Sequence, residues 1–436
     1  MFYSHWENKS NAKNYLHKID YKKAVEHSGL PLIYEGNSVY VTKNEDHSLV
    51  VGSTGSGKTQ SIILPILKMA MLANESVVVN DPKGELYQKT AKEFEKRAYD
   101  VIMLDFNNSI YGNYYNPLNL AYRLYKENNQ DKCMNVIEEI GYYLFTDTKD
   151  KTDPFWENST IDYFTGLCLY LFNNSSKEVN LNDVFTLANK LNDEKECDKF
   201  LKEIGKDNAV YYNVSGTLTA PKDTKGSIIA IFNQRIKKFV CKENLSNMMS
   251  KTDFDISSIG NSKTAIFIVS GYYDYSNNLI PLFINQIFET VNIYGNHKVK
   301  INVLLDEFDN LLPIKNFAEI INYSRSIRIN FTCIIQSFVN LMNTYGKDNF
   351  EIIKLCFPNI VYLYANDLYT LEEVSKMCGN ESDKKPLASP EELKMMQHFE
   401  AVILIPRVMP FKTKLSPDYK INWNIDFEEA NFILRK

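Results

Sequence analysis

A glycine-rich stretch near the N-terminal end most constrains how this chain can fold. Residues 50–59 read VVGSTGSGKT, which fits the pattern G-x-x-x-x-G-K-[ST]. The four fixed positions are held by Gly52, Gly57, Lys58 and Thr59. A short apolar run, residues 48–51, precedes the pattern, and an apolar stretch, residues 60–73, follows it. The pattern with these flanks predicts a strand, a phosphate-binding turn and a helix, whereas a glycine-rich surface turn would not need them.

The residue types in this stretch suit the binding of a magnesium triphosphate. Glycines let several backbone N–H groups face one phosphate cluster, and the helix that follows places its positive end under the same anion. Lys58 can reach the β- and γ-phosphates, and the hydroxyl of Thr59 can bind Mg²⁺. The sequence therefore predicts ATP and Mg²⁺ as cofactors. The predicted nucleotide-binding residues are Gly52, Ser53, Thr54, Gly55, Ser56, Gly57, Lys58, Thr59 and Gln60.

Strand-like and helical stretches alternate over much of the chain, which at 436 residues is long enough for two or three domains. The strand-like runs are residues 48–51, 76–80, 101–105, 264–269, 301–305, 330–335, 359–363 and 401–405. This alternation predicts an α/β fold with a parallel sheet, and the run 401–405 is expected to close it. Between residues 121 and 250 apolar residues recur with a helical period, which predicts an all-α domain inserted into the α/β domain.

These patterns predict an order of domains and several local features. The expected domains are an N-terminal extension (1–29), the first part of a nucleotide-binding domain (30–120), an all-α domain (121–250) and the second part of the nucleotide-binding domain (251–436). Residues 1–30 have a weak helical pattern, and residues 30–40 suggest a hairpin. Pro65 should kink the helix after the glycine-rich turn. Residues 389–392, SPEE, predict a helix start with a capping box.

Two carboxylates follow a strongly apolar run in the second half of the chain. Asp306 and Glu307 come directly after VLL at residues 303–305. At the carboxyl end of a parallel strand, Asp306 would hold Mg²⁺ together with Thr59, and Glu307 would polarise the attacking water. A strand end followed by a helix cap would explain the same residues. The phosphate-binding pattern upstream favours the catalytic interpretation.

Other polar residues permit both a functional and a structural interpretation. Gln336 follows an apolar run and could sense the γ-phosphate or be an ordinary loop residue. Arg325 or Arg328 could act as an arginine finger on a neighbouring subunit, or lie solvated or paired with a nearby acid such as Asp309 or Glu319. Asp81 could support the metal or water, or cap a helix. A basic cluster could follow a nucleic-acid backbone or form solvated helix faces; its members are Lys222, Lys225, Arg235, Lys237 and Lys238.

Composition limits the classes of partner and compartment. The net charge of −5 means that binding to nucleic acid would require a local basic surface. The seven cysteines are scattered without C-x-x-C spacing, which predicts reduced thiols in the cytosol and no zinc site. The sequence contains no apolar run of roughly 18 residues, the length needed to span a bilayer.

Taken together, the motifs resemble those of the VirD4/TraG-type coupling proteins of conjugation and type IV secretion, which are related to the FtsK/HerA class of ring ATPases. The resemblance covers residues 30–410. It rests on GSTGSGKT at 52–59, DPKGEL at 81–86, YNPL at 115–118, PFWE at 154–157, LLDEFDNL at 304–311, IIQS at 334–337 and YG at 345–346. Members of this family usually begin with membrane helices, and this sequence departs from that pattern.

The resemblance implies a RecA-like P-loop NTPase domain interrupted by an all-α domain. It implies DNA-stimulated ATP hydrolysis in a homo-hexamer, with a monomer allowed in isolation, and transfer of DNA, expected to be single-stranded, with its relaxase. It further implies that the all-α domain contacts DNA or the relaxase–DNA complex. By position, Arg325 matches the trans-acting arginine and Gln336 the glutamine motif. The expected location is the cytoplasm, docked at the inner face of the membrane through secretion channel proteins.

Two alternative functions remain open from the sequence. The chain could be a cargo receptor that is gated by nucleotide and has little motor activity. It could instead be another DNA-translocating motor of the FtsK/HerA class, although the chain ends soon after its last predicted strand. Slow turnover with relaxase binding by residues 121–250 would favour the receptor.

Overall fold

The computed structural model describes two compact units. The residues described are 3–43, 46–146, 153–271, 273–425 and 427–435. The first unit comprises residues 1–103, 256–270 and 287–432, and the second comprises residues 104–255, 271–286 and 433–436, less the undescribed positions within them. Among the described residues, no helix is both long and apolar enough to cross a membrane.

The described residues form a nine-stranded sheet whose central strands are parallel. From edge to edge, its strands are β14 (Phe411–Lys414), β13 (Glu400–Leu404), β10 (Asn359–Tyr364), β4 (Ser48–Gly52), β9 (Ile329–Ile335), β8 (Ile301–Leu305), β5 (Ser76–Asn80), β7 (Thr264–Val269) and β6 (Asp100–Asp105). The pairings from β10 through β4, β9, β8 and β5 to β7 are parallel, and β13 and β14 add antiparallel pairs at one edge. The predicted α/β fold with a largely parallel sheet is confirmed.

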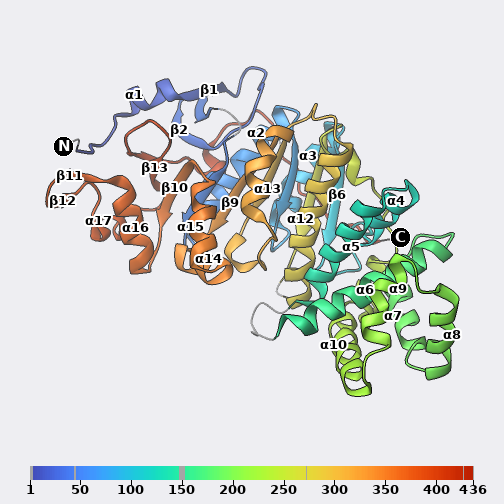
Figure 1. Ribbon diagram of the computed structural model, residues 1–436. Coiled ribbons are helices and arrows are strands. Elements are labelled where there is room, and N and C mark those ends of the chain that lie inside the picture. Colours follow the sequence, from blue (N-terminus) through green and yellow to red (C-terminus); the bar gives the residue numbers. More distant parts are fainter. Residues whose placement is uncertain (1–2, 44–45, 147–152, 272, 426, 436) are drawn as a thin grey trace. The chain divides into compact units, whose positions relative to one another are not determined.

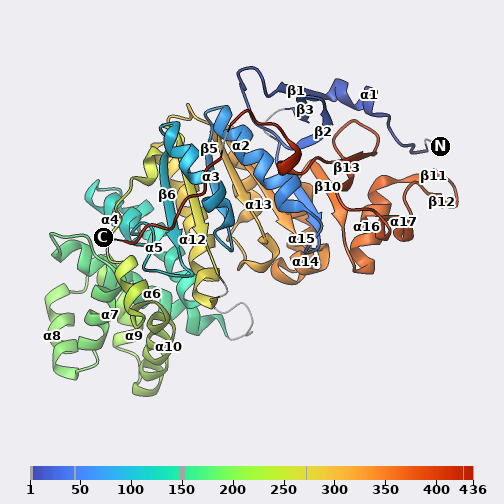
Figure 2. The same cartoon turned by 180° about the vertical axis from the view of Figure 1, so that it is seen from behind.

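Helices cover both faces of this sheet. Figure 1 shows α13 (Phe317–Ser324), α14 (Phe338–Tyr345) and α15 (Lys347–Leu355) on the near face, and Figure 2 shows α2 (Leu64–Leu72) and α3 (Glu85–Lys96) on the opposite face. Every residue of β4, β5 and β8 is buried. Strands buried on both sides read as continuous apolar runs, which is why these strands could be predicted from the sequence.

The prediction for the last strand was wrong in one respect. Residues 401–405 were expected to close the sheet, but β14 pairs with β13 beyond them, with Ala401 opposite Thr413. β14 has only four residues, FKTK, in which buried and exposed positions alternate. So short a polar strand at a sheet edge has little apolar signal of its own.

A separate three-stranded sheet is formed by the N-terminal residues. Its order is β1 (Leu16–Asp20), β3 (Ser38–Thr42) and β2 (Pro31–Glu35). The β2–β3 hairpin confirms the one predicted at residues 30–40. The weak helical pattern before it holds over α1 (Lys9–Ala12) and a 3-10 turn at Lys13–Tyr15. β1 follows and pairs with β3, with Leu16 opposite Thr42 and Asp20 opposite Ser38.

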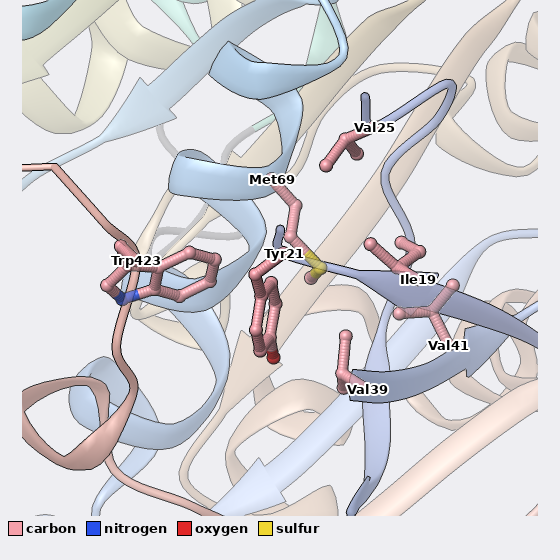
Figure 3. Close-up of a cluster of buried hydrophobic side chains, with 7 residues drawn as sticks. All are labelled: Ile19, Tyr21, Val25, Val39, Val41, Met69 and Trp423. Carbon is pink, nitrogen blue, oxygen red and sulfur yellow. The ribbon is translucent and has the colours of Figure 1, made fainter. Parts of the chain in front are cut away.

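The three-stranded sheet packs against the helix that follows the glycine-rich turn. Figure 3 shows Ile19, Tyr21, Val39 and Val41 gathered near Met69 of α2. The ring of Trp423, which comes from the C-terminal part of the chain, lies 4.8 Å from that of Tyr21, measured between centroids. Segments from three parts of the sequence thus hold α2 in place.

The remaining helices and two short strands are divided between the two units. They are α4 (Asn119–Lys126), α5 (Gln130–Phe145), α6 (Pro154–Asn174), α7 (Leu181–Lys190), α8 (Glu194–Ile204), α9 (Ala209–Leu218), α10 (Lys222–Val240), α11 (Glu243–Met248), α12 (Asp274–Tyr294), α16 (Leu368–Cys378), α17 (Pro390–Lys394) and the short strands β11 (Asn380–Ser382) and β12 (Lys385–Pro386). The predicted capping box begins α17: Ser389 Oγ accepts from the N–H of Glu392 at 3.2 Å, and Glu392 Oε2 accepts from the N–H of Ser389 at 3.2 Å.

Candidate functional site

The glycine-rich sequence forms a turn at the carboxyl edge of the parallel strands. β4 leads into it, and the N–H of Ser53 donates to the carbonyl of Tyr364 at 2.8 Å, which joins the start of the turn to β10. Gly55 and Gly57 have φ angles of +82° and +92°. Glycine adopts this left-handed region without steric cost, so the turn uses the freedom that its sequence provides. Helical backbone follows from Thr59, as predicted.

Close contacts explain two of the glycines. A Cβ atom at Gly52 would lie 2.5 Å from Ser56 Oγ and 3.2 Å from the Cδ of Lys58. The ammonium of Lys58 donates a hydrogen bond to the carbonyl oxygen of Gly52, so the lysine folds back over the turn. At Gly57, a Cβ would lie 2.7 Å from Cε1 of Phe399. A larger residue at either position would force these side chains to move.

Pro65, which was expected to kink the helix, lies in the first turn of α2. Residues Thr59–Ile63 form a π-helical segment before α2 begins at Leu64, whose N–H donates to the carbonyl of Thr59. Pro65 comes next and has no N–H to donate. Such π segments are frequent at functional sites, and this one lies directly after the candidate phosphate turn.

The two predicted carboxylates follow β8, which is separated from β4 by β9 alone. The backbone carbonyl of Asp306 accepts from Asn80 Nδ2 at 2.7 Å, and its Oδ1 accepts from the N–H of Glu307 at 3.0 Å. Burial raises the pKa of Asp306 to about 6, although the positive charge of the Lys58 ammonium acts to lower it. Glu307 has a φ of +54°, which is uncommon for a residue with a side chain. Residues in such conformations cluster at active sites and ligand-binding sites.

Asp81 accepts a hydrogen bond from the first turn of α3 and also lines the cavity described below. It follows β5, and its Oδ2 accepts from the N–H of Tyr87 at 2.9 Å, which caps α3. Burial raises the pKa of Asp81 to about 7, and the neighbouring charge of Asp306 adds to the rise. A carboxyl group that titrates near neutrality beside a second carboxyl group is typical of functional sites.

These residues surround one cavity of about 390 Å³ in the first unit. It is lined by Thr54, Gly55, Gly57, Lys58, Thr59, Gln60, Asp81, Pro82, Lys83, Glu85, Leu86, Asp306, Glu307 and His398. The structure therefore brings the turn and the carboxylate pair together, although about 250 residues separate them in sequence. Gly52, Ser53 and Ser56 of the turn do not line this cavity, and neither do Gln336 and Arg325.

The donor groups of the cavity fit a magnesium nucleotide. Thr59 offers a hydroxyl oxygen and Asp306 a carboxylate, which are the hard oxygen ligands that Mg²⁺ prefers. Lys58 and Lys83 also line the cavity, and their positive charge suits phosphates. The side-chain Oδ1 of the buried Asn80, whose amide holds the Asp306 backbone, has no hydrogen-bond partner among the described residues.

Gln336 lies beside the site without lining the cavity. It follows β9, the strand that lies between β4 and β8 in the sheet. Its N–H donates to Asp309 Oδ2 at 2.9 Å. Burial raises the pKa of Asp309, while the hydrogen bond from Gln336 opposes that rise. The glutamine is thus tied through its backbone to the turn that carries Asp306 and Glu307.

Arg325 lies at the opposite edge of the sheet from the glycine-rich turn. It precedes β9, which runs parallel to β4, so it sits where β4 begins and not where β4 ends. Its guanidinium forms an ion pair with Asp46 (3.0 Å) and is 55 % exposed. The partner is thus neither of the acids, Asp309 and Glu319, that the sequence suggested. Arg328 donates to the carbonyls of His297 and Lys298.

Sequence reasoning missed His398, which lines the cavity. It belongs to the short connection between α17 and β13 and reaches the site only through the folding of the sheet. A single histidine without a motif carries no local signal. Lys83 also lines the cavity and could have been found, because it belongs to the DPKGEL stretch.

The sequence matches the family described as type IV secretory system conjugative DNA transfer over residues 5–385. No curated protein matches the chain. Among solved structures, the bacterial conjugative coupling protein TrwBdeltaN70 in its unbound monoclinic form is 13% identical with a TM-score of 0.72, covering 100% of this chain and 96% of that one. These values show a shared fold.

Two further solved structures share the fold. The plasmid coupling protein TrwB in complex with ADP and Mg²⁺ is 14% identical with a TM-score of 0.73, covering 100% of this chain and 97% of that one. VirB4 of Thermoanaerobacter pseudethanolicus is 12% identical with a TM-score of 0.58, covering 90% of this chain and 98% of that one. The predicted RecA-like fold is therefore confirmed.

Proposed function

The chain belongs to the type IV secretory system conjugative DNA transfer family, and from this membership we propose that it is an ATP-hydrolysing coupling protein. It recruits a relaxase–DNA substrate and drives DNA, with its attached protein, into a type IV secretion channel. The observation that carries the proposal is the cavity in which the Lys58–Thr59 turn meets Asp306 and Glu307. The complex of TrwB with ADP and Mg²⁺ supports ATP and Mg²⁺ as the cofactors.

Each residue at the cavity has a role that its chemistry supports. The glycine-rich turn offers backbone N–H groups to the phosphates, and Lys58 neutralises the β- and γ-phosphates. Thr59 and Asp306 hold Mg²⁺, which would offset the charge that develops on the phosphates. Glu307 accepts a proton from the attacking water. Burial raises the pKa of Asp306, so its ionised form is costly without a counter-charge, and a cation held by this carboxylate would offset that cost.

Gln336 and Arg325 act from outside the cavity. Gln336 reports the state of the γ-phosphate through its bond to the turn at Asp309. Arg325 lies at the opposite edge of the sheet, so it reaches a nucleotide only in another subunit, as a hexameric ring would allow. The exposure of its guanidinium supports this, and the ion pair with Asp46 would have to open.

DNA and relaxase contact the second unit through its helices. α10 carries the basic cluster that includes Lys222, Lys237 and Lys238, all of them exposed. Lysines on one helix can neutralise phosphates of single-stranded DNA. At the membrane, secretion channel proteins hold the protein on the cytoplasmic side.

ATP hydrolysis measured with and without single-stranded DNA tests the proposal. Lys58→Ala should abolish turnover, and Glu307→Gln should keep ATP binding while slowing turnover by about a hundredfold or more. Lys384→Ala is the matched control, because this exposed lysine does not line the cavity. DNA should raise the rate of the wild type, and salt should reduce that stimulation.

Three outcomes would contradict the proposal in whole or in part. Wild-type turnover no faster than that of Lys58→Ala, with or without DNA, would remove the motor. Full turnover in Glu307→Gln would remove that residue from catalysis while leaving the ATPase. ATP binding with very slow turnover would instead favour a nucleotide-gated receptor for relaxase.

A further inference from the structure

The strand order places different segments on the two sides of the glycine-rich turn. β9 and then β8 lie on one side of β4, and Asp306 and Glu307 follow β8. β10 and then β13 lie on the other side. Because β13 runs antiparallel to β10, it begins at the edge of the sheet where β4 ends. The residues just before β13 therefore lie at the edge that carries the cavity.

The strand register brings this segment level with the turn. Gly52 pairs with Tyr364 between β4 and β10. Tyr362 pairs with Val402 between β10 and β13, so two residues further on Tyr364 is level with Glu400. The chain that enters β13 must then pass beside the residues that follow Gly52.

Hydrogen bonds hold this segment in a defined conformation. The N–H of Gln397 donates to Glu400 Oε2 at 2.8 Å, and the N–H of Glu400 donates to the carbonyl of Gln397 at 2.9 Å. The carbonyl of Phe399 accepts from the N–H of Leu415 at 2.8 Å. Phe399 has a φ of +67° and packs its ring on Gly57. The residue between these anchors is His398.

His398 presents its imidazole to the cavity. It lines the main cavity together with Lys58 and Gln60, and also a neighbouring cavity of about 160 Å³ with Thr54 and Tyr364. The ring is exposed and lies 3.9 Å from the ring of Phe399, measured between centroids. Its Cε1 is also near the turn, since a Cβ at Gly57 would lie 3.4 Å from it. An exposed aromatic surface on a fixed segment is available to a ligand.

Resting on the proposed function, we infer that His398 binds the nucleoside end of the nucleotide, with its imidazole against the base. The γ-phosphate must face Asp306 and Glu307, which lie on the β8 side of the turn. The rest of the nucleotide then extends away from β8, toward β10 and β13, where His398 stands. Stacking on an imidazole tolerates any base, so this contact adds affinity without selecting adenine over guanine.

Binding of two ligands that differ only at the nucleoside end tests the inference. Calorimetry with Mg²⁺ compares ATP with inorganic tripolyphosphate, which has the phosphates and no nucleoside. His398→Ala should weaken ATP binding about tenfold and leave tripolyphosphate binding unchanged. His398→Phe should restore ATP affinity, because it keeps a flat ring. His5→Ala, at an exposed histidine outside the cavity, is the matched control.

The outcomes separate this inference from the proposed function. Unchanged ATP affinity in His398→Ala would overturn it, and so would equal losses for ATP and tripolyphosphate, since those would place His398 on the phosphates or on the shape of the turn. Lys58→Ala should weaken both ligands. If the wild type binds neither ligand better than Lys58→Ala does, the proposed nucleotide site itself is wrong, and the inference falls with it.

Discussion

β5 carries a buried carboxylate immediately before its first residue and another immediately after its last, and the two have opposite surroundings. Glu75, at the amino end, accepts hydrogen bonds from Ser28 through both oxygens and from Asn302 Nδ2 at 2.8 Å. The ammonium of Lys300 lies 3.5 Å from Glu75 Oε2 and is equally buried. Asp81, at the carboxyl end, has backbone N–H groups as its donors and Asp306 as a charged neighbour, and burial raises its pKa to about 7.

β4 repeats the contrast. At its amino end His47 is buried with both ring nitrogens bonded: Nδ1 accepts from the N–H of Phe331 at 3.0 Å, so Nε2 donates to the carbonyl of Ile321 at 2.9 Å. At its carboxyl end, in the glycine-rich turn, the buried Ser56 Oγ has no partner among the described residues. At the amino ends of β4 and β5, His47 and Glu75 have their hydrogen bonds made. At the carboxyl ends, Ser56 Oγ and Asn80 Oδ1 have no partner among the described residues, and Asp81 lies beside a second carboxyl group.

This difference assigns separate tasks to the two edges of one sheet. A buried polar group with every bond made holds segments together, whereas one without partners costs stability until a ligand supplies them. The amino edge should therefore respond to mutation through stability, and the carboxyl edge through activity. Removing a polar group should destabilise the first and stabilise the second.

The largest effect is expected at Glu75. Glu75→Ala leaves Lys300 buried without its counter-charge, which should lower the free energy of unfolding by about 3–5 kcal/mol. Urea denaturation of the full chain measures the change. Glu95→Ala, at an exposed glutamate on α3, should shift it by less than about 0.5 kcal/mol. A loss at Glu75 as small as that at Glu95 would remove the contrast between the two edges.

A smaller effect, dependent on pH, is expected at His47. Burial lowers the pKa of His47 to about 4, below its usual 6.5, so the folded protein resists a proton that the unfolded chain accepts. This contribution is fully present above pH 6.5 and declines as the pH falls toward 4, by about 3 kcal/mol in all. The stability advantage of the wild type over His47→Gln should shrink accordingly between pH 7 and pH 4. An advantage that is constant with pH would show that His47 is not buried as a neutral ring.

Much of the fold could be predicted because its central strands carry their own signal. β4, β5 and β8 are apolar runs buried on both sides, and each was expected within a residue of its observed bounds. β1 and β14 are short and mixed in polarity, and they exist because a distant strand pairs with them. A pattern confined to a few residues cannot report such a pairing.

The same distinction holds at the candidate site. The glycine-rich turn and the Asp306–Glu307 pair are local motifs, and the cavity unites them. The network around Glu75 joins residues more than two hundred positions apart, and no local pattern marks it. His398 reaches the cavity only through the antiparallel order of β10 and β13. Contacts set by topology therefore stay hidden until the sheet order is known.

The last effect is expected at Asp81 and should have the opposite sign to that at Glu75. Its folded pKa of about 7 lies above the usual 3.8, so stability is lost as the pH rises from 4 through 7 and the buried carboxyl ionises. Asp81→Asn stays neutral and can still accept from Tyr87, so its stability should match that of the wild type below pH 4 and exceed it by about 4 kcal/mol at pH 8. Urea denaturation at both pH values measures this, with the exposed Asp100→Asn as control. Destabilisation at pH 8 would mean that ionised Asp81 holds the fold together, as Glu75 does, and that the two ends of β5 do not differ.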